Sequence, residues 1–109
     1  MEKTIEEIDF SKGDGLIPII VQDINTKEVL TLAYSNKESL ELTKKTGNSW
    51  FWSRSRKKLW MKGEESGNTQ KVKDILVDCD SDAVIYLVEP SGPACHTGEA
   101  NCFHNSLKK

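Results

Sequence analysis

Two kinds of metal-binding side chain gather in the last third of the chain. Three carboxylates alternate with a thiol and a hydroxyl at five consecutive positions, Asp78, Cys79, Asp80, Ser81 and Asp82. Two further thiols follow at Cys95 and Cys102. Thiolates bind a borderline ion such as zinc, whereas carboxylates bind a hard ion such as magnesium. Two metal preferences so close together indicate an enzyme site more than a structural clip.

The spacing of the cysteines is compatible with a zinc site that has an open position. Cys79, Cys95 and Cys102 lack the Cys-x-x-Cys pairs of many structural zinc sites, and three protein ligands leave a fourth position for water. Zinc lowers the pKa of such a water towards about 7. The alternative is that the thiols are buried and inert, as free cysteines often are. Cys95 argues against this alternative, because its Gly-, Pro- and Thr-containing surroundings form no apolar stripe.

Each of the two histidines follows a cysteine closely. His96 adjoins Cys95 and suits the role of general base, general acid or fourth metal ligand. His104 lies near the end of the chain, and we expect it to be a surface histidine.

The aspartates have two other interpretations. Together with Glu89 they occupy positions 1, 3, 5 and 12 of an EF-hand loop, but Ala83 stands at position 6, where that loop needs glycine, and residues 84–88 are typical of a strand. The plainer interpretation is an acidic hairpin turn exposed to water. Because three like charges this close repel each other, a bound cation would relieve a real cost.

A second polar cluster lies upstream of the cysteines. Arg54 and Arg56 are two positions apart, so in an extended strand both guanidinium groups point to one face and suit a phosphate clamp. Lys62 is a third basic candidate, and Ser66 and Asn68 lie in a Gly- and Ser-containing loop that suits a sugar or a base. The alternative is a solvated, charged strand without a ligand.

The hydrophobic pattern predicts a β-rich α+β domain with mostly antiparallel strands and one main helix. A capping box of Ser35 and Glu38 is expected to start this helix, which spans about 36–46 and ends at Gly47. Strands are expected at 16–22, 28–34, 49–55, 59–62, 72–77 and 83–89, with the acidic segment at the bend between the last two. The segment after Pro90 is expected to be ordered only if other elements fix it.

Composition argues against several classes of protein. The 109 residues are expected to form one domain, 1–109, and a formal net charge of −2 gives no indication of a nucleic-acid or membrane protein. The N-terminus lacks the apolar core of a signal peptide, and no apolar run approaches the ~20 residues of a membrane span. Three cysteines cannot all pair, so a cytoplasmic location is expected. A core this small gains stability from a metal or a second subunit.

Several longer motifs make the chain similar to the phosphoribosyl-AMP cyclohydrolase family of histidine biosynthesis. They run in the family order over nearly the whole chain: Asp14-Gly15-Leu16-Ile17-Pro18, Trp52-Ser53-Arg54-Ser55-Arg56, Leu59-Trp60, Lys62-Gly63-Glu64, Ser66-Gly67-Asn68, Asp78-Cys79-Asp80-Ser81-Asp82, Gly92-Pro93-Ala94-Cys95-His96-Thr97-Gly98 and Cys102-Phe103. The departures are Phe51 where tyrosine is common, Asn68 where histidine is also frequent, and Asn101 where serine is expected. None of them falls on a candidate metal ligand.

The resemblance implies a reaction and its cofactors. It implies a zinc- and magnesium-dependent hydrolase that opens the N1–C6 bond of the adenine ring of 1-(5-phosphoribosyl)-AMP, a small nucleotide. The zinc ligands would be Cys79, Cys95 and Cys102, and the magnesium ligands would be Asp78, Asp80 and Asp82. An intertwined homodimer is also implied, with a zinc site shared between the two chains.

The resemblance also implies roles for the remaining candidates. His96 is expected to act as general acid or base, and the expected substrate-binding residues are Arg54, Arg56, Lys62, Ser66 and Asn68. The pyrophosphohydrolase domain that is fused to this one in some relatives is not expected here.

Two other classes of protein remain as alternatives. A non-catalytic binding module stabilised by zinc would hold the metal with four protein ligands, His96 or His104 supplying the fourth. A zinc nucleobase deaminase would release ammonia, although the chain lacks the usual histidine/glutamate and paired-cysteine motifs of such enzymes.

Overall fold

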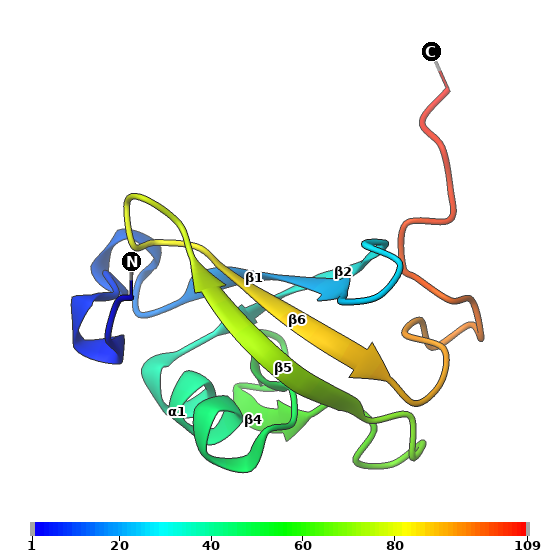
Figure 1. Cartoon of the computed structure of the whole chain (residues 1–109), viewed down its shortest axis with the longest axis horizontal. Coiled ribbons are helices and arrows are strands. Elements are labelled where there is room, and N and C mark those ends of the chain that lie inside the picture. Colours follow the sequence, from blue (N-terminus) through cyan, green and yellow to red (C-terminus); the bar gives the residue numbers. More distant parts are fainter. Residues whose placement is uncertain (1, 109) are drawn as a thin grey trace.

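A four-stranded sheet, a two-stranded hairpin and one α-helix make up the fold (Figure 1). The structure is a computed structural model, and it describes residues 2–108. The strands are β1 (Ile17–Asp23), β2 (Val29–Ser35), β3 (Trp50–Ser53), β4 (Lys58–Met61), β5 (Gln70–Val77) and β6 (Val84–Pro90), and the helix is α1 (Lys37–Thr46). Two short 3₁₀ turns, η1 (Ile5–Glu7) and η2 (Ser11–Gly13), precede β1.

The sheet has the strand order β2-β1-β6-β5, and β3 and β4 form a separate hairpin. β1 pairs with β2 and β5 pairs with β6 in antiparallel fashion, while β1 and β6 run parallel in the middle of the sheet. The prediction of an α+β domain with mostly antiparallel strands and one main helix is therefore confirmed. In the described part of the chain, no helix has the length and apolar character needed to span a membrane.

The helix begins one residue later than the predicted capping box requires. Asn36 is the N-cap: its side chain accepts a hydrogen bond from the Ser39 amide at 2.8 Å, and Ser39 Oγ accepts one from the Asn36 amide at 2.9 Å. Ser35 is instead the last residue of β2 and is fully buried. The Ser35/Glu38 prediction was wrong because the strand continues to Ser35, while Gly47 ends the helix at φ 78° as expected.

One face of the sheet carries the hydrophobic core, which α1 and the β3–β4 hairpin cover (Figure 1). Strand side chains alternate between faces, so Ile19, Val21 and Val84 all point into this core. Tyr86 lies among them, and its hydroxyl donates to the Trp50 carbonyl at 3.3 Å. Burial raises the pKa of Tyr86 to about 12. The centre of β6 is thus tied to the hairpin beneath it.

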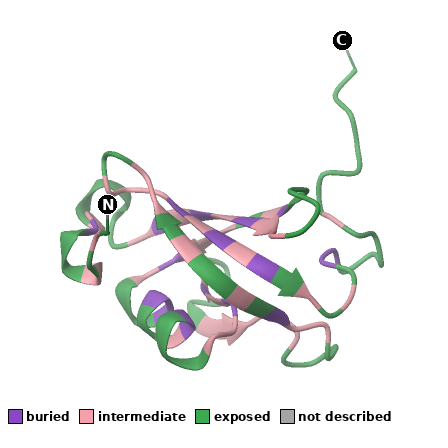
Figure 2. Ribbon diagram, in the orientation of Figure 1, coloured by how far each residue is buried: buried purple, intermediate pink, exposed green. Residues whose placement is uncertain are grey.

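The opposite face of the sheet carries an apolar row that crosses all four strands. Leu32, Ile20, Ile85 and Leu76 are successive cross-strand neighbours in it. Leu32 is 45% exposed and Leu76 is 43% exposed. Figure 2 shows the resulting alternation of exposed and half-buried residues along β5. We call this row, together with the strand surface around it, the outer face.

Candidate metal centre and active site

The acidic segment forms the turn between β5 and β6, and Asp78 organises it. The Asp78 carboxylate accepts hydrogen bonds from the backbone amides of Asp82 at 2.9 Å and Ala83 at 3.2 Å. The Asp82 amide is the main cause of a pKa of Asp78 below its usual value. Asp78 therefore has a structural role in the turn, besides its predicted role as a magnesium ligand.

The N-terminal segment holds this turn from outside. Lys3 Nζ donates to the carbonyls of Asp78 at 3.2 Å and Cys79 at 3.1 Å and to Ser81 Oγ at 2.7 Å. The Asp9 amide donates to the Ser81 carbonyl at 2.7 Å. An ammonium group has three donor hydrogens, so the contacts of Lys3 use all of them. The contact of Lys3 with the Cys79 carbonyl was not predicted, because 76 positions separate the two residues.

A second lysine pairs with the last aspartate of the turn. Lys12 Nζ lies 3.0 Å from Asp82 Oδ2, and this hydrogen bond raises the pKa of Lys12. A hollow of about 260 Å³ lies beside the pair, and Leu16 and Pro18 of the first sequence motif also line it. The structure therefore brings the first motif and the acidic motif together, and lysine supplies the cation nearest to Asp82.

Cys95 and Cys102 lie at the other end of β6, in a segment that hydrogen bonds fix. The amides of Ala94 and Cys95 donate to the carbonyls of Ala100 and Glu99, each at 3.2 Å, and close a small loop. The Cys102 amide donates to the Leu30 carbonyl of β2 at 2.7 Å. The segment after Pro90 was expected to be ordered only if other elements fix it, and these hydrogen bonds fix it.

The Cys95 thiol has polar neighbours although it is only 8% exposed. The Thr97 hydroxyl donates to Cys95 Sγ at 3.1 Å, and His104 Nε2 lies 3.7 Å from the same sulfur. Hydrogen bonds from Thr97, then from His104 and Cys102, lower the pKa of Cys95 to about 6. Cys95 is therefore largely thiolate at neutral pH, which is the form that binds metals. His104 is exposed, as expected of a surface histidine, and it also contacts Cys95.

A single chain does not assemble either predicted metal site. Among residues 2–108, no three His, Cys, Asp or Glu side chains converge closely enough to hold an ion. Cys79 is exposed at the β5–β6 turn, and β6, which has seven residues, separates it from Cys95. At about 3.3 Å per residue these ends lie roughly 20 Å apart. The donor set at Cys95 and Cys102, two thiols with an imidazole nearby, nevertheless fits zinc by its chemistry.

The two arginines lie in a turn and not in the predicted strand. β3 ends at Ser53 and pairs with Lys58 of β4, so residues 54–57 form the connection. The strand prediction was wrong because the chain reverses direction over residues 54–57, with Lys57 at φ 51°. The Arg54 guanidinium stacks on the Tyr34 ring at 3.9 Å from its centroid. Arg54 is therefore held near the acidic-turn end of the sheet, where Tyr34 pairs with Pro18.

The other predicted substrate residues lie near the Cys95 end. The Ser91 amide donates to the Thr69 carbonyl at 2.9 Å, which joins the loop of Ser66 and Asn68 to the segment before Cys95. A side chain at Gly92 would overlap the Asn68 amide, since a Cβ there would lie 2.3 Å from Asn68 Oδ1. Lys62 is fixed at the start of the same loop by its amide, which donates to the Ser49 carbonyl at 2.9 Å. His96 is exposed beside Cys95.

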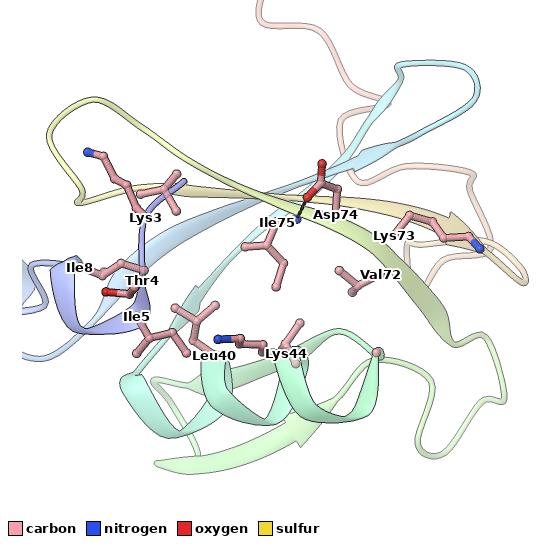
Figure 3. A pocket seen from close by; sticks show the side chains of 13 residues that line it. Lys3, Thr4, Ile5, Ile8, Leu40, Lys44, Val72, Lys73, Asp74 and Ile75 are labelled. Carbon is pink, nitrogen blue, oxygen red and sulfur yellow. Dashed lines mark hydrogen bonds between the residues drawn. The ribbon is translucent and has the colours of Figure 1, made fainter. Parts of the chain in front are cut away.

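A larger cavity of about 320 Å³ lies elsewhere, between α1, β5 and the N-terminal segment (Figure 3). Its lining includes Ile5, Ile8, Leu40 and Ile75, and none of the predicted site residues. Cavity size alone would therefore select a region without the predicted catalytic and metal-binding residues.

Comparison with known proteins identifies the family. The family model described as Phosphoribosyl-AMP cyclohydrolase matches residues 31–104. A Phosphoribosyl-AMP cyclohydrolase of Nitrosopumilus maritimus is 80% identical over 99% of this chain and 100% of its own length. One of Clostridium botulinum is 57% identical over 98% of this chain and 97% of its own. The Histidine biosynthesis bifunctional protein HisIE of Bacillus subtilis is 64% identical over 93% of this chain, which spans 48% of that protein. The chain belongs to the phosphoribosyl-AMP cyclohydrolase family.

Proposed function

We propose that this chain catalyses the hydrolytic opening of the adenine ring of 1-(5-phosphoribosyl)-AMP, the third step of histidine biosynthesis. The observation that carries the proposal is full-length similarity to proteins of that name, together with the loop that sets His96 beside a thiolate-forming Cys95. Water adds across the N1–C6 bond: its oxygen bonds to C6, one hydrogen goes to N1, and the other goes to the exocyclic nitrogen. The products of the bond cleavage stay in one molecule, and no ammonia leaves.

The metal centre of this proposal is a zinc site shared by two chains. Cys95 and Cys102 come from one chain, and Cys79 comes from a second copy, because Cys79 of the same chain lies at the far end of β6. A bound zinc supplies the Lewis acidity that makes water a nucleophile at neutral pH. The remaining work belongs to the protein's own groups.

The outer face supplies the surface on which a second copy docks. Its apolar row of Leu32, Ile20, Ile85 and Leu76 is incompletely covered within one chain. A twofold axis that lies in this interface and perpendicular to the strands makes the contact self-complementary and reverses the strand direction of the partner. The Cys79 end of one copy then lies beside the Cys95 end of the other. The intertwined homodimer expected from the resemblance has a physical reason here, since dimerisation buries the apolar row and completes the zinc ligands.

The side chains near this composite site divide the remaining tasks. His96 holds or delivers the proton that N1 gains, since it is the exposed imidazole next to Cys95. Arg54, Arg56 and Lys62 bind the two phosphates, and Ser66 and Asn68 bind the sugar or the base. The Tyr34 ring beneath Arg54 restricts the guanidinium to one side of the turn and so orients it.

Magnesium is proposed at the acidic turn, with Asp78, Asp80 and Asp82 as its ligands. One oxygen of Asp78 already accepts two backbone amides, and Asp82 is paired with Lys12. These three carboxylates do not converge in the chain as it stands, so an ion here requires Lys12 to move away.

Two inactive variants test the shared site directly. Cys79→Ala and Cys95→Ala proteins are each expected to lack activity, measured as the ultraviolet change of phosphoribosyl-AMP on ring opening. When the two are co-expressed, about half of the dimers pair one variant with the other, and each such dimer has one intact site. About a quarter of the wild-type activity should return. No recovery in verified mixed dimers would contradict a zinc site shared in this way.

The same assay separates the alternatives of other classes. Ammonia released in step with the absorbance change would identify a deaminase. Absence of turnover by fully zinc-loaded wild-type protein would favour a non-catalytic zinc module. Loss of turnover after zinc chelation, restored by added zinc, is the result expected of the proposed enzyme.

A further inference from the structure

His104 lies against the Cys95 sulfur although nine positions separate the two residues. The chain is fixed on both sides of the contact. The Cys95 amide is bonded to Glu99 within the small loop, and the Cys102 amide is bonded to Leu30 of β2. The Phe103 amide donates to the Asn101 side chain at 2.7 Å and directs the chain back after Cys102. The placement of His104 therefore follows from these backbone constraints.

The separation of the two atoms matches a pair of ligands on one zinc ion. Zinc–sulfur bonds are about 2.3 Å and zinc–nitrogen bonds about 2.0–2.1 Å, so at a tetrahedral angle the two donor atoms lie about 3.6 Å apart. His104 Nε2 and Cys95 Sγ are 3.7 Å apart. A simple hydrogen bond between imidazole and thiol would also bring the atoms close, so the two explanations need an experiment that separates them.

We propose that His104 is a fourth protein ligand of the zinc, from the same chain as Cys95 and Cys102, and that it occupies the coordination position that water needs. The proposal rests on the proposed function, because the zinc centre is taken from there. Cys95, Cys102 and His104 do not converge closely enough in the described chain, so the proposal requires the Cys102 side chain to close on the Cys95–His104 pair when zinc binds. With Cys79 of the second copy, the donors become three thiolates and one imidazole, which close the coordination shell.

His104 is also the donor that can most readily leave. It is exposed, and it belongs to a segment, residues 103–108, that has no helix or strand. Cys95 is buried and Cys102 is anchored to β2. Displacement of an exposed imidazole from such a tail moves no core residue. The coordination shell of the metal would thus be filled by protein ligands at rest and would have an open position when His104 is displaced.

Cobalt substitution of the intact dimer tests the proposal without an activity measurement. In the wild-type protein, the visible spectrum should indicate four protein ligands, and the relaxation of water protons should indicate no exchanging water on the metal. In a His104→Ala protein, the cobalt bands should shift and an exchanging water should appear. The zinc affinity, measured by competition with a chromophoric chelator, should fall by at least about tenfold.

His96→Gln is the matched control, because His96 adjoins Cys95 in the sequence but is given no role as a ligand here. It should leave the cobalt spectrum and the zinc affinity within twofold of wild type. A His104→Ala protein with an unchanged cobalt spectrum would overturn the proposal, even with a weaker zinc affinity, since that pattern indicates a hydrogen bond only. Wild-type protein without bound zinc would overturn both this proposal and the zinc centre. Zinc-loaded wild type with the same spectrum as the variant would overturn this proposal alone.

Discussion

Each end of strand β6 carries a candidate thiol ligand, but the two ends are built in different ways. At the β5–β6 turn, charged side chains do the fixing: Lys3 binds the turn backbone and Lys12 pairs with Asp82. At the Cys95 end, backbone hydrogen bonds to the carbonyls of Glu99 and Leu30 hold the segment in place. Cys79 is exposed, whereas Cys95 is buried.

The difference shows what each end lacks. The acidic turn already contains its counter-charges, so a metal ion there has to compete with lysine. The Cys95 end has low-pKa sulfur and imidazole but too few donors in one chain. In the proposed dimer, each end is half of a site, and burial of the apolar outer face brings the two halves of different copies together.

The largest expected effect is at the buried thiol. Cys95→Ala should abolish zinc binding and ring opening together, because it removes the one candidate thiol that is buried and has a lowered pKa. Zinc content by atomic spectroscopy and turnover by absorbance are the two measurements. If a zinc-free Cys95→Ala protein turned over at the wild-type rate, the Cys95 end would have no part in the chemistry.

The next effect concerns the surface between the two ends. Leu76→Arg places a charge in the apolar row and should convert the dimer to monomers, with loss of bound zinc, because burying an unpaired charge is costly. Analytical ultracentrifugation measures the first effect. Leu107→Arg is the matched control, since Leu107 is 92% exposed in the tail and should tolerate the same change. Dimers that persist in Leu76→Arg would place the interface elsewhere.

His96 separates chemistry from metal binding at the Cys95 end. His96→Ala should keep its zinc and lose about 10²–10⁴-fold in kcat, as expected for removal of a general acid or base. A loss of less than about threefold, with zinc retained, would make His96 a bystander and leave the proton at N1 to another group.

Lys3 tests how the acidic end is held. Lys3→Met removes three hydrogen bonds and should increase amide exchange at Ser81 and Asp82 about fivefold, which corresponds to roughly 1 kcal/mol of local stability. Lys27→Met, at an exposed turn between β1 and β2, is the control. Exchange that stays at the wild-type rate would mean that Asp78 alone shapes the turn.

The last effect lies midway along β6, in the core, and appears only at alkaline pH. Because burial raises the pKa of Tyr86 to about 12 and an unfolded tyrosine titrates near 10, the folded state holds its proton more tightly. The stability from this difference is present below pH 10 and is lost as the pH rises to 12, by at most about 3 kcal/mol. Denaturant titrations should show a steeper loss for wild type than for Tyr86→Phe. Equal slopes would contradict the raised pKa.

The sequence predicted the elements better than the placement of side chains within them. The single helix and the strand order along the chain follow from local patterns, and the Gly47 helix end follows from one residue type. The prediction of Ser35 as the helix N-cap was wrong, because Ser35 pairs with Ile17 and so extends β2 by one residue. This pairing is a long-range contact. The prediction that Arg54 and Arg56 lie in or next to a strand was wrong for a similar reason, because the register of β3 with β4 decides where the turn begins.

The sequence by itself determined the donor chemistry of the site. The sequence contains three thiols, three clustered carboxylates and two histidines, and the motifs in which they lie indicate the family. Only the tertiary structure decided which of them can meet. Strand β6 runs between Cys79 and Cys95 and places them at its opposite ends, and the tail brings His104 to the Cys95 sulfur. Spacing along a chain does not encode distance across a sheet, because that distance depends on strand direction and register, which long-range pairing sets.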